Sequence, residues 1–436
     1  MNSQTYVNFF RQTSPYIHTH RGKTFVIALA GDAVLDSNCH RLLADIALLQ
    51  SLGVRIVLVH GARPQIDQRL AQSNLNSDFK GHLRITDVEA MMCVKQAIGS
   101  TRLQLEAGLS MSLPNSPMHG AEVRVMGGNF MVAKPIGVID GVDHQHSGEV
   151  RRVDRVGIQS QLDSGAMVLV SPIGFSPTGE AFNLSYIDVA SHAAVAIGAD
   201  KLIFISAASN ISHNGGLLRS LSIPAVEEYL KNSVAPPQLE QTLLRASQQA
   251  CKGGVERVHL IGYRDDGALL SELFTREGSG TLIIQDYSET LRPASIDDVG
   301  GILDLIQPLE ESGVLVKRSR ELLETEISRF MVALHPEGFL VGCAALYPLG
   351  STGSGEIACV ATHPDFLSQG TASRLLVAIE NQAHSQSIGR LYVLTTQAAH
   401  WFQEQGFIET AVNALPEDKK LLYNYQRSSR VLCKVL

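Results

Sequence analysis

A glutamate and a small-residue loop stand close together near the C-terminal end of the sequence. Residues 356–374 read EIACVATHPDFLSQGTASR, where an apolar run carrying one glutamate meets a Pro-marked turn and then small residues. Gly370 begins the loop, and a helix-like run follows it. Free N–H groups at a helix start favour an anion such as pyrophosphate, and small residues let the backbone approach it. A carboxylate such as Glu356 can remove a proton from an ammonium, leaving a lone pair that attacks a carbonyl.

The small-residue loop and Glu356 also have an ordinary structural interpretation. The order of the elements around them decides between the structural and the functional interpretation. Small-residue turns that open helices are common, and a lone strand glutamate more often faces water. A strand ending in VATHP before such a loop, with WFQEQGF further along, resembles the GNAT acetyltransferases over residues 292–436. The resemblance implies an α+β domain that uses acetyl-CoA as co-substrate, without a permanently bound cofactor, and Glu356 as the general base.

The same resemblance assigns the acetyl-CoA contacts. It places the pantetheine arm along the backbone of Val360, and the pyrophosphate on Gly370, Thr371, Ala372 and Ser373. Leu367 stands where the family usually has Arg or Gln, so one charged contact to the pyrophosphate is missing.

A second departure concerns the proton that the leaving thiolate takes up. Many family members have a Tyr that donates this proton. The corresponding motif reads WFQEQGF in this chain, where Phe402 cannot donate a proton. We expect Thr395 to serve, with Thr396 or a water molecule as alternatives.

Two arginines and a lysine in this domain suit an acceptor that carries two carboxylates. Arg318 and Lys317 lie in VLVKRSRELLE, and Arg427 lies in LLYNYQRSSRVL. A guanidinium holds a carboxylate through two parallel hydrogen bonds, although each arginine alone is more often a surface residue.

Taken together, the strings VKRSRE, GEIACVA and LYNYQRS resemble the bacterial two-domain N-acetylglutamate synthase family, over nearly the whole chain. The family resemblance implies acetyl transfer from acetyl-CoA to L-glutamate, the first step of arginine biosynthesis, by direct attack. Arg318 and Arg427 would bind the glutamate carboxylates with help from Lys317, and Cys359 would line the pocket without acting as nucleophile. An acetyltransferase for another amino acid, or a catalytically weak arginine-binding protein, are the alternatives.

The first part of the chain alternates between continuous apolar strands and helices, as in TFVIALAG, CHRLLADIALLQSLG and VRIVLVHG. This pattern predicts an α/β domain with a mostly parallel sheet covered by helices on both faces. The strings FVIALAGDAV, LVHGARPQID and LDSGAMVLVSPIG resemble the amino acid kinase fold. Working kinases of that group have a lysine where this chain has Ala28, and Arg63 would crowd their phosphate site. We therefore expect no kinase activity.

The expected role of the first domain is regulation by L-arginine. The segment ALLSELFTREGSGT resembles the arginine-binding segment of arginine-inhibited family members. The resemblance assigns the effector site to Glu272, Gly278, Lys201 and Tyr16. An N-terminal helix over residues 3–12 also resembles the family's, whose helices interlock subunits into hexamers.

Composition and length limit the partners, the compartment and the domain organisation that the sequence allows. The 436 residues are 44% apolar and 18% charged, with net charge −7, which argues against nucleic acid or an anionic membrane as the main partner. Six scattered cysteines and an N-terminus without an apolar core favour a soluble cytoplasmic protein. The His pairs at 18–20 and 144–146 each lack a third ligand, so we expect no metal site. We place domains at 1–285 and 292–436, joined by a linker at 286–291.

Overall fold

The computed structural model divides the chain into two compact units, Met1–Asp286 and Tyr287–Leu436, which are described separately. The residues described are 3–80, 83–111, 118–208, 211–213, 216–232, 236–275, 278–285, 290–335, 338–350, 353–367, 370–421, 423 and 429–436. Arg427 therefore lies outside the described residues.

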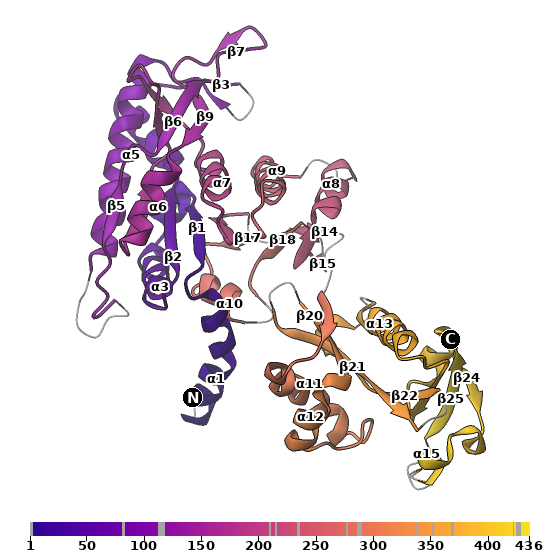
Figure 1. Ribbon diagram of the computed structural model, residues 1–436. Helices are drawn as coiled ribbons and strands as arrows, with labels where there is room; N and C mark the ends of the chain where they lie inside the picture. Colours follow the sequence, from indigo (N-terminus) through magenta and orange to yellow (C-terminus); the bar gives the residue numbers. More distant parts are fainter. Residues whose placement is uncertain are drawn as a thin grey trace. The chain divides into compact units, whose positions relative to one another are not determined.

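An eight-stranded sheet forms the centre of the first unit, in the order β16-β18-β17-β13-β1-β2-β10-β5 (Figure 1). Every pair in it is parallel except β17 with β18. All six residues of β1 and of β13 are buried, as expected for strands covered on both faces. The strands are β1 (Thr24–Leu29), β2 (Arg55–His60), β5 (Val125–Gly127), β10 (Met167–Val170), β13 (Lys201–Ser206), β16 (Ser220–Ser222), β17 (Arg257–Gly262) and β18 (Thr281–Ile284).

Helices cover both faces of this sheet, which confirms the predicted fold class. Residues of α6, α7 and α9 share one buried apolar cluster with alternate residues of β1, β2 and β13. The helices are α1 (Ser3–His20), α2 (Gly31–Leu35), α3 (Cys39–Ser51), α4 (Arg63–Gln72), α5 (Val88–Leu109), α6 (Arg155–Asp163), α7 (Tyr186–Ile197), α8 (Ile223–Asn232), α9 (Gln238–Lys252) and α10 (Ala268–Phe274).

Shorter strands complete the first unit. A four-stranded sheet has the order β12-β11-β6-β9, and three hairpins pair β3 with β4, β7 with β8 and β14 with β15. Their bounds are β3 (Phe79–Lys80), β4 (Leu83–Arg84), β6 (Met131–Pro135), β7 (Val138–Ile139), β8 (Val142–Asp143), β9 (Gly148–Val153), β11 (Ile173–Phe175), β12 (Ala181–Asn183), β14 (Ser212–His213) and β15 (Gly216–Leu217).

The N-terminal helix is longer than the sequence predicts. It continues through Pro15 to His20, whereas the prediction ended at residue 12. The reason is tertiary contact: Tyr16 is buried, and Nε2 of His20 lies 2.8 Å from the carbonyl oxygen of Leu273 on α10. Packing of this last turn therefore outweighs the helix-breaking tendency of proline.

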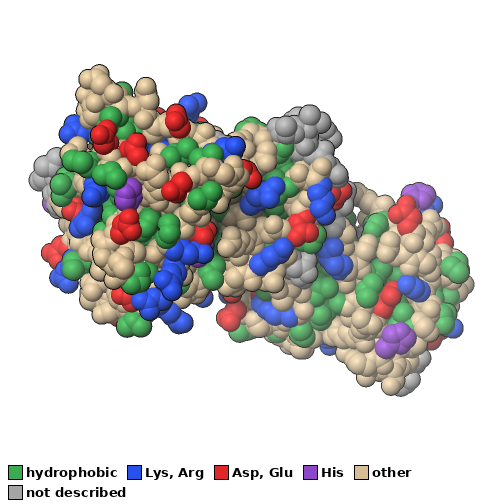
Figure 2. All heavy atoms as spheres, turned by 90° about the horizontal axis from the view of Figure 1, so that it is seen from above, with side chains coloured by type: hydrophobic (Ala, Val, Ile, Leu, Met, Phe, Trp, Pro, Cys, Tyr) green, Lys and Arg blue, Asp and Glu red, His purple; other side chains and the backbone are tan. Residues whose placement is uncertain are grey.

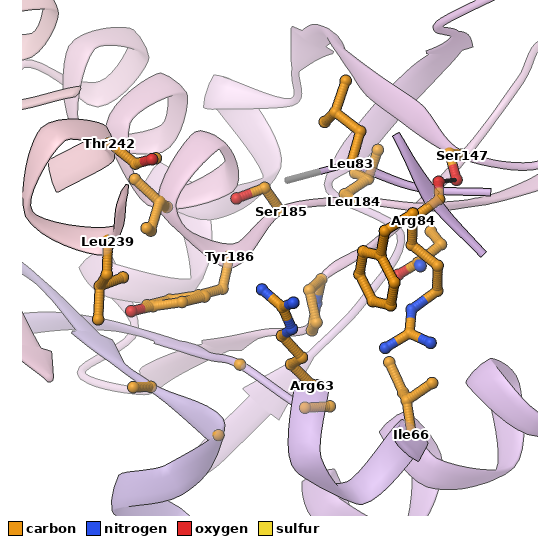
Figure 3. Close-up of a pocket in the computed structure, with 18 of the residues that line it drawn as sticks. Arg63, Ile66, Leu83, Arg84, Ser147, Leu184, Ser185, Tyr186, Leu239 and Thr242 are labelled. Atoms are coloured by element: carbon orange, nitrogen blue, oxygen red, sulfur yellow. Dashed lines mark hydrogen bonds between the residues drawn. The ribbon is translucent and has the colours of Figure 1, made fainter. Parts of the chain in front are cut away.

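A cleft of about 800 Å³ opens at the carboxyl ends of the parallel strands of this unit (Figure 3). Its walls include the segments that directly follow β1, β2, β10 and β13, together with the first residues of α4, α7 and α9. This edge of an open α/β sheet is where ligands commonly bind.

The second unit is a seven-stranded sheet in the order β19-β20-β21-β22-β23-β25-β24. Only β22 and β23 run parallel, and the other neighbours are antiparallel. The strands are β19 (Thr290–Pro293), β20 (Phe330–Leu334), β21 (Leu340–Leu349), β22 (Ser354–Thr362), β23 (Arg390–Thr395), β24 (Ile408–Thr410) and β25 (Arg430–Val435).

One long helix packs on each face of this sheet. Ile302 and Ile306 of α11 join one buried cluster, and Leu375 and Ile379 of α13 join the cluster on the opposite face. The helices are η1 (Ile296–Asp298), α11 (Val299–Glu311), α12 (Arg320–Glu326), η2 (Ile327–Arg329), η3 (Pro364–Phe366), α13 (Thr371–Ser385), α14 (Ala399–Glu404), η4 (Val412–Ala414) and α15 (Glu417–Leu421).

Acidic and basic side chains are mixed over the visible surface of both units (Figure 2). In the described part of the chain, none of the helices has the length and apolar character that a membrane span requires.

Candidate active site

A cavity of about 500 Å³ in the second unit brings several predicted residues together. Glu356 and Cys359 line it from β22, and Lys317 and Arg318 line it from the segment between α11 and α12. The cavity thus joins a carboxylate, two cations and a thiol from segments far apart in the sequence.

Glu356 lies in the middle of the sheet, opposite Tyr347 on β21 and Tyr392 on β23. Its side chain is 12% exposed, and Oε2 lies 2.6 Å from Nζ of Lys419 on α15. The ordinary interpretation, a strand glutamate that faces water, is therefore wrong, because the side chain is mostly buried in the middle of the sheet. The predictions did not include Lys419, and the surrounding sequence LPEDKK gave no signal beyond surface charge.

The strands beside Glu356 separate and leave backbone groups open. The pairing of β22 with β23 ends at Ile357, while β22 continues to Thr362 and β23 continues to Thr395. The pairing of β22 with β21 shifts its register close to where β22 and β23 separate. Cys359, at this place on β22, has a φ of 51°. Val360 follows immediately, in the stretch where its backbone no longer pairs with β23. Unpaired N–H and C=O groups at such a split can bind an extended ligand.

Cys359 is buried, and burial raises the pKa of its thiol to about 11, although Arg318 acts in the opposite direction. The thiol therefore stays protonated at neutral pH. A protonated thiol is a poor nucleophile, which agrees with a lining role for this cysteine.

Arg318 reaches into the cavity beside Tyr347. Its guanidinium carbon lies 5.9 Å from the Tyr347 ring centroid, and Nη1 donates to the carbonyl of Val316 at 3.1 Å. The Tyr347 hydroxyl in turn donates to Oε2 of Glu326 at 2.7 Å. These contacts hold the guanidinium at the wall of the cavity and leave some of its N–H groups for a ligand.

The predicted pyrophosphate loop opens α13. Gly370 has φ of 80° and precedes the helix without a side-chain cap, and Thr371 is buried at the first position. Ala372 and Ser373 follow in the first turn, so all four predicted residues occupy the helix start. A side chain added at Gly370 would meet Nη1 of Arg374 at 3.2 Å.

The loop therefore has a nearby cation that the predictions missed. Arg374 could have been found as a basic residue in the first turn after the loop. Leu367 is 60% exposed, so its position offers no charge to a phosphate.

Thr395 lies at the end of β23 but not in the lining of the cavity. Its Oγ1 accepts from the N–H groups of Gln397, at 3.3 Å, and Ala398, at 3.0 Å. Within the described residues, no acceptor for the hydroxyl hydrogen is recorded. Phe402 is buried against Phe407, with ring centroids 5.5 Å apart, and therefore belongs to the core. Tyr423, absent from the predictions, lines the cavity, and its hydroxyl donates to the Ser429 carbonyl.

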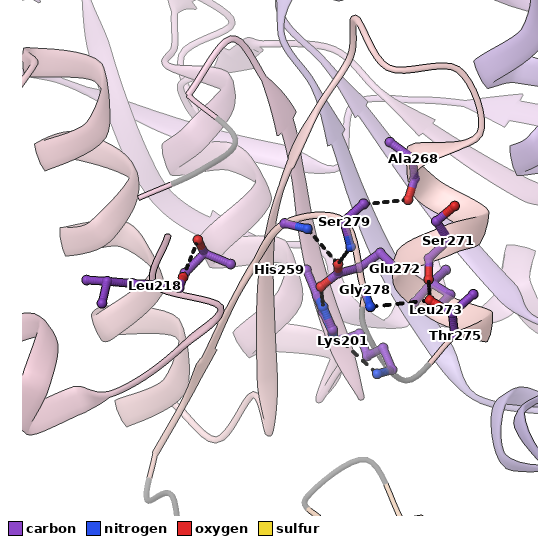
Figure 4. A network of polar contacts seen from close by, with 12 residues as sticks. Lys201, Leu218, His259, Ala268, Ser271, Glu272, Leu273, Thr275, Gly278 and Ser279 are labelled. Carbon is purple, nitrogen blue, oxygen red and sulfur yellow. Dashed lines mark hydrogen bonds and ion pairs between the residues drawn. The ribbon is translucent and has the colours of Figure 1, made fainter. Parts of the chain in front are cut away.

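In the first unit, three of the four predicted effector residues form one polar network (Figure 4). Oε1 of Glu272 lies 2.7 Å from Nδ1 of His259, and Nε2 of that ring lies 3.3 Å from Nζ of Lys201. The backbone N–H groups of Ser279 and Gly280, which follow the Gly278 turn, donate to Oε2 of Glu272.

This network is buried, and its hydrogen bonds offset the effect of burial on the charge of Glu272. Burial alone disfavours the carboxylate, but the hydrogen bonds from His259, Ser279 and Gly280 outweigh it and lower the pKa of Glu272. A lysine at Nε2 and a carboxylate at Nδ1 favour the ring with its proton on Nδ1. His259 was missed, although a histidine inside the apolar run RVHLIG is a recognisable signal. Tyr16 is buried on α1 and is not part of these contacts.

No group of three His, Cys, Asp or Glu side chains within the described ranges could hold a metal ion.

Comparison with known proteins identifies the family. Residues 23–262 match the amino acid kinase family, and residues 326–409 match the acetyltransferase (GNAT) domain. An amino-acid acetyltransferase of Azotobacter vinelandii is 51% identical over 432 residues, covering 99% of each chain. The chain belongs to the amino-acid acetyltransferase family. A Pseudomonas syringae pv. syringae amino-acid acetyltransferase is 50% identical over the same length.

Two crystal structures of N-acetylglutamate synthase from Neisseria gonorrhoeae are similar to this acetyltransferase at 36% identity, over 99% of each chain. The complex with coenzyme A and L-arginine has a TM-score of 0.82, and the complex with coenzyme A and N-acetyl-glutamate has 0.62. The resemblance to this synthase family is confirmed, and so are the acyltransferase activity and acetyl-CoA as co-substrate.

Proposed function

We propose that this amino-acid acetyltransferase transfers the acetyl group of acetyl-CoA to the α-amine of L-glutamate, giving N-acetyl-L-glutamate and CoA. The observation that carries the proposal is the shared cavity of Glu356 and Arg318. A base and a guanidinium in one cavity suit an amine acceptor that carries a carboxylate. The gonococcal N-acetylglutamate synthases support glutamate as that acceptor.

In this mechanism Glu356 takes a proton from the glutamate ammonium. The neutral nitrogen then attacks the thioester carbonyl, a C–N bond forms, the C–S bond breaks, and the sulfur leaves as a thiolate. As the amide forms, the nitrogen loses its second proton. Thr395 gives its hydroxyl proton to the thiolate, which yields CoA-SH, and takes up the proton that leaves the nitrogen, so the hydroxyl is restored. Arg318, with Lys317 and Arg427, binds the carboxylates of glutamate, and Cys359 lines the pocket.

The first turn of α13 binds the pyrophosphate of acetyl-CoA. The free N–H groups of this helix start suit an anion, and the Arg374 guanidinium near Gly370 adds a positive charge. The backbone of Val360 holds the pantetheine arm at the split between β22 and β23.

The first unit makes the enzyme responsive to L-arginine, which inhibits it. Glu272, Lys201, the Gly278 turn and Tyr16 form the effector site, and arginine acts by preferring one state of the enzyme. Feedback inhibition by arginine suits the first enzyme of arginine biosynthesis in the cytoplasm. We further propose a hexamer with α1 at a subunit contact, which light scattering would test.

The test of this function is release of CoA thiol by the purified protein. Each of a panel of amino acids is supplied with acetyl-CoA, with and without L-arginine. We expect release with L-glutamate that arginine suppresses. Release with a different amino acid would contradict the proposed acceptor, and glutamate-dependent release that arginine leaves unchanged would contradict the proposed regulation.

A further inference from the structure

An amine of the protein itself lies beside the proposed general base. Nζ of Lys419 is 2.6 Å from Oε2 of Glu356, and both residues line the cavity of the second unit. In the mechanism proposed above, the ammonium of the acceptor amino acid must reach this carboxylate to lose a proton. Lys419 thus presents an ammonium at the position where the mechanism requires one.

The surroundings of Lys419 combine shielding from water with freedom to move. Its side chain is 21% exposed and that of Glu356 is 12% exposed, so most of both groups is removed from bulk water. Lys419 lies on α15, a helix of five residues, and its flexible four-carbon stem can carry Nζ a short way without moving the helix. The cavity of about 500 Å³ leaves space beside this amine for an acetyl group.

The acetyl carbonyl of acetyl-CoA is expected within reach of the same amine. Glu356 and Cys359 line the cavity from β22, and Val360, which we propose to hold the pantetheine arm, follows directly on that strand. The proposed mechanism brings the acceptor nitrogen to Glu356 and to the acetyl carbonyl at once. A nitrogen that already lies beside Glu356 is therefore close to the carbonyl as well.

Two other lysines show what is particular to Lys419. Lys420 follows it on α15, but Nζ of Lys420 lies 3.3 Å from Oε1 of Glu417, whose side chain is 81% exposed. Lys317 lines the cavity and is exposed, yet the carboxylate of Glu356 pairs with Lys419. The structure thus offers one lysine at the proposed base, a second elsewhere in the same cavity, and a third that pairs with a surface glutamate.

We propose that the enzyme acetylates its own Lys419 when acetyl-CoA is bound and the acceptor amino acid is absent. This inference rests on the proposed role of Glu356. Glu356 takes one proton from the Lys419 ammonium, and the neutral nitrogen attacks the acetyl carbon. A C–N bond forms and the C–S bond breaks. The second proton of the nitrogen passes to the thiolate through Thr395, which gives Nε-acetyl-lysine and CoA-SH, and Glu356 returns its proton to water.

Acetylation of Lys419 would slow the enzyme. The acetyl group removes the charge of the lysine and with it the ion pair to Glu356. The modified enzyme should therefore lose activity by about the same factor as a variant that lacks the ammonium, roughly tenfold. L-Glutamate protects Lys419, because its own ammonium takes the place of Nζ at Glu356. A shortage of the acceptor is thus converted into a lasting decrease in activity.

Peptide mass spectrometry of the full-length protein tests this proposal. The protein is incubated with acetyl-CoA labelled with ¹³C in the acetyl group, without an amino acid, so that the label distinguishes new acetyl groups from those acquired in the cell. We expect label on Lys419 at least about tenfold faster than on Lys317 or Lys420, because the base and the thioester are held beside it. L-Glutamate, with acetyl-CoA kept in excess, should slow labelling of Lys419 and leave that of Lys420 unchanged.

Glu356→Gln separates acetylation by the enzyme from chemical acetylation. This variant should label Lys419 at least about tenfold more slowly than the wild type and Lys420 at the same rate. If Glu356→Gln does not fold, protection of Lys419 by L-glutamate in the wild type decides the question. Equal labelling of the three lysines in the wild type, or no label on Lys419, would overturn the inference.

Formation of N-acetyl-L-glutamate, measured on the same preparation, distinguishes this inference from the proposed function. A preparation that forms N-acetyl-L-glutamate but leaves Lys419 unlabelled overturns the inference and leaves the proposed function standing. A preparation that labels Lys419 selectively but forms no N-acetyl-L-glutamate supports the inference and contradicts the proposed acceptor.

Discussion

The Glu356 carboxylate lies 2.6 Å from the Lys419 ammonium, on the wall of the cavity that Arg318 also lines. This contact holds the carboxylate, which we propose as the general base, in a fixed orientation at the cavity wall. The two side chains come from β22 and from the short helix α15, and only folding brings them together. Lys419 is therefore a positioning residue for the proposed base.

Replacing Lys419 should impair catalysis without removing acetyl-CoA binding. We expect Lys419→Met to lower kcat by roughly tenfold, because Glu356 loses the ion pair that orients it. Lys419→Arg keeps a cation and should retain most of the activity. Lys420→Met is the control, since Lys420 pairs with Glu417 instead. Steady-state kinetics would contradict this role if Lys419→Met and Lys420→Met behaved alike.

Arg318→Lys should mainly weaken binding of the amino-acid acceptor. Lysine keeps the charge but loses the planar fork, so we expect KM for glutamate to rise about tenfold or more while KM for acetyl-CoA changes little. Arg320→Lys is the matched control, because Arg320 pairs with Glu324 on the exposed face of α12. An unchanged KM for glutamate in Arg318→Lys would remove this residue from the acceptor pocket.

Glu272→Gln should reduce the response to arginine. The substitution keeps the shape of the side chain but removes its charge from the network with His259 and Lys201. The positively charged group of the bound arginine then loses the Glu272 carboxylate as its partner. The arginine concentration for half-inhibition should therefore rise at least tenfold. Inhibition curves at fixed substrate concentrations measure this. Curves that coincide with the wild type would place the effector site elsewhere.

Acid should destabilise the first unit partly through His60. This side chain is fully buried, and burial, with a smaller effect from Arg102, lowers its pKa to about 4. An unfolded histidine titrates near 6.5, so between about pH 6.5 and 4 the unfolded state binds a proton that the folded state does not. The stability contributed by neutral His60 is therefore present above pH 6.5 and is lost as the pH falls toward 4.

The size of this effect is at most about 1.4 kcal/mol per pH unit in that range. Denaturant unfolding at pH 7 and pH 5.5 should show a smaller pH dependence for His60→Gln than for the wild type. His119→Gln, at an exposed histidine of the same unit, should keep the wild-type dependence. Equal dependence in all three proteins would exclude His60 as a source of acid sensitivity.

The fold was predictable because its signals are local. Apolar runs such as FVIAL and RIVLV are buried on both faces in β1 and β2, and Gly370 begins the loop before α13 as expected. The start of the N-terminal helix was also predicted, but its end was not, because the contacts of His20 with α10 are not visible in the sequence.

The contacts between distant segments could not be predicted. Glu356 could be predicted to line the site because a strand glutamate before a phosphate-type loop is a local pattern of the family that the chain resembles, whereas Lys419 is one of many surface-type lysines in the sequence. His259 links Lys201 to Glu272 through both ring nitrogens, and that geometry depends on the register of β13 with β17.

The most direct test of the central claim supplies acetyl-CoA labelled with ¹³C in the acetyl group to the wild type and to Glu356→Gln, with saturating L-glutamate. NMR of the products should show labelled N-acetyl-L-glutamate from the wild type. A rate at least about a hundredfold lower is expected for Glu356→Gln, because general-base catalysis contributes a factor of that order. Equal rates in the two proteins, or no labelled N-acetyl-L-glutamate from the wild type, would contradict the account.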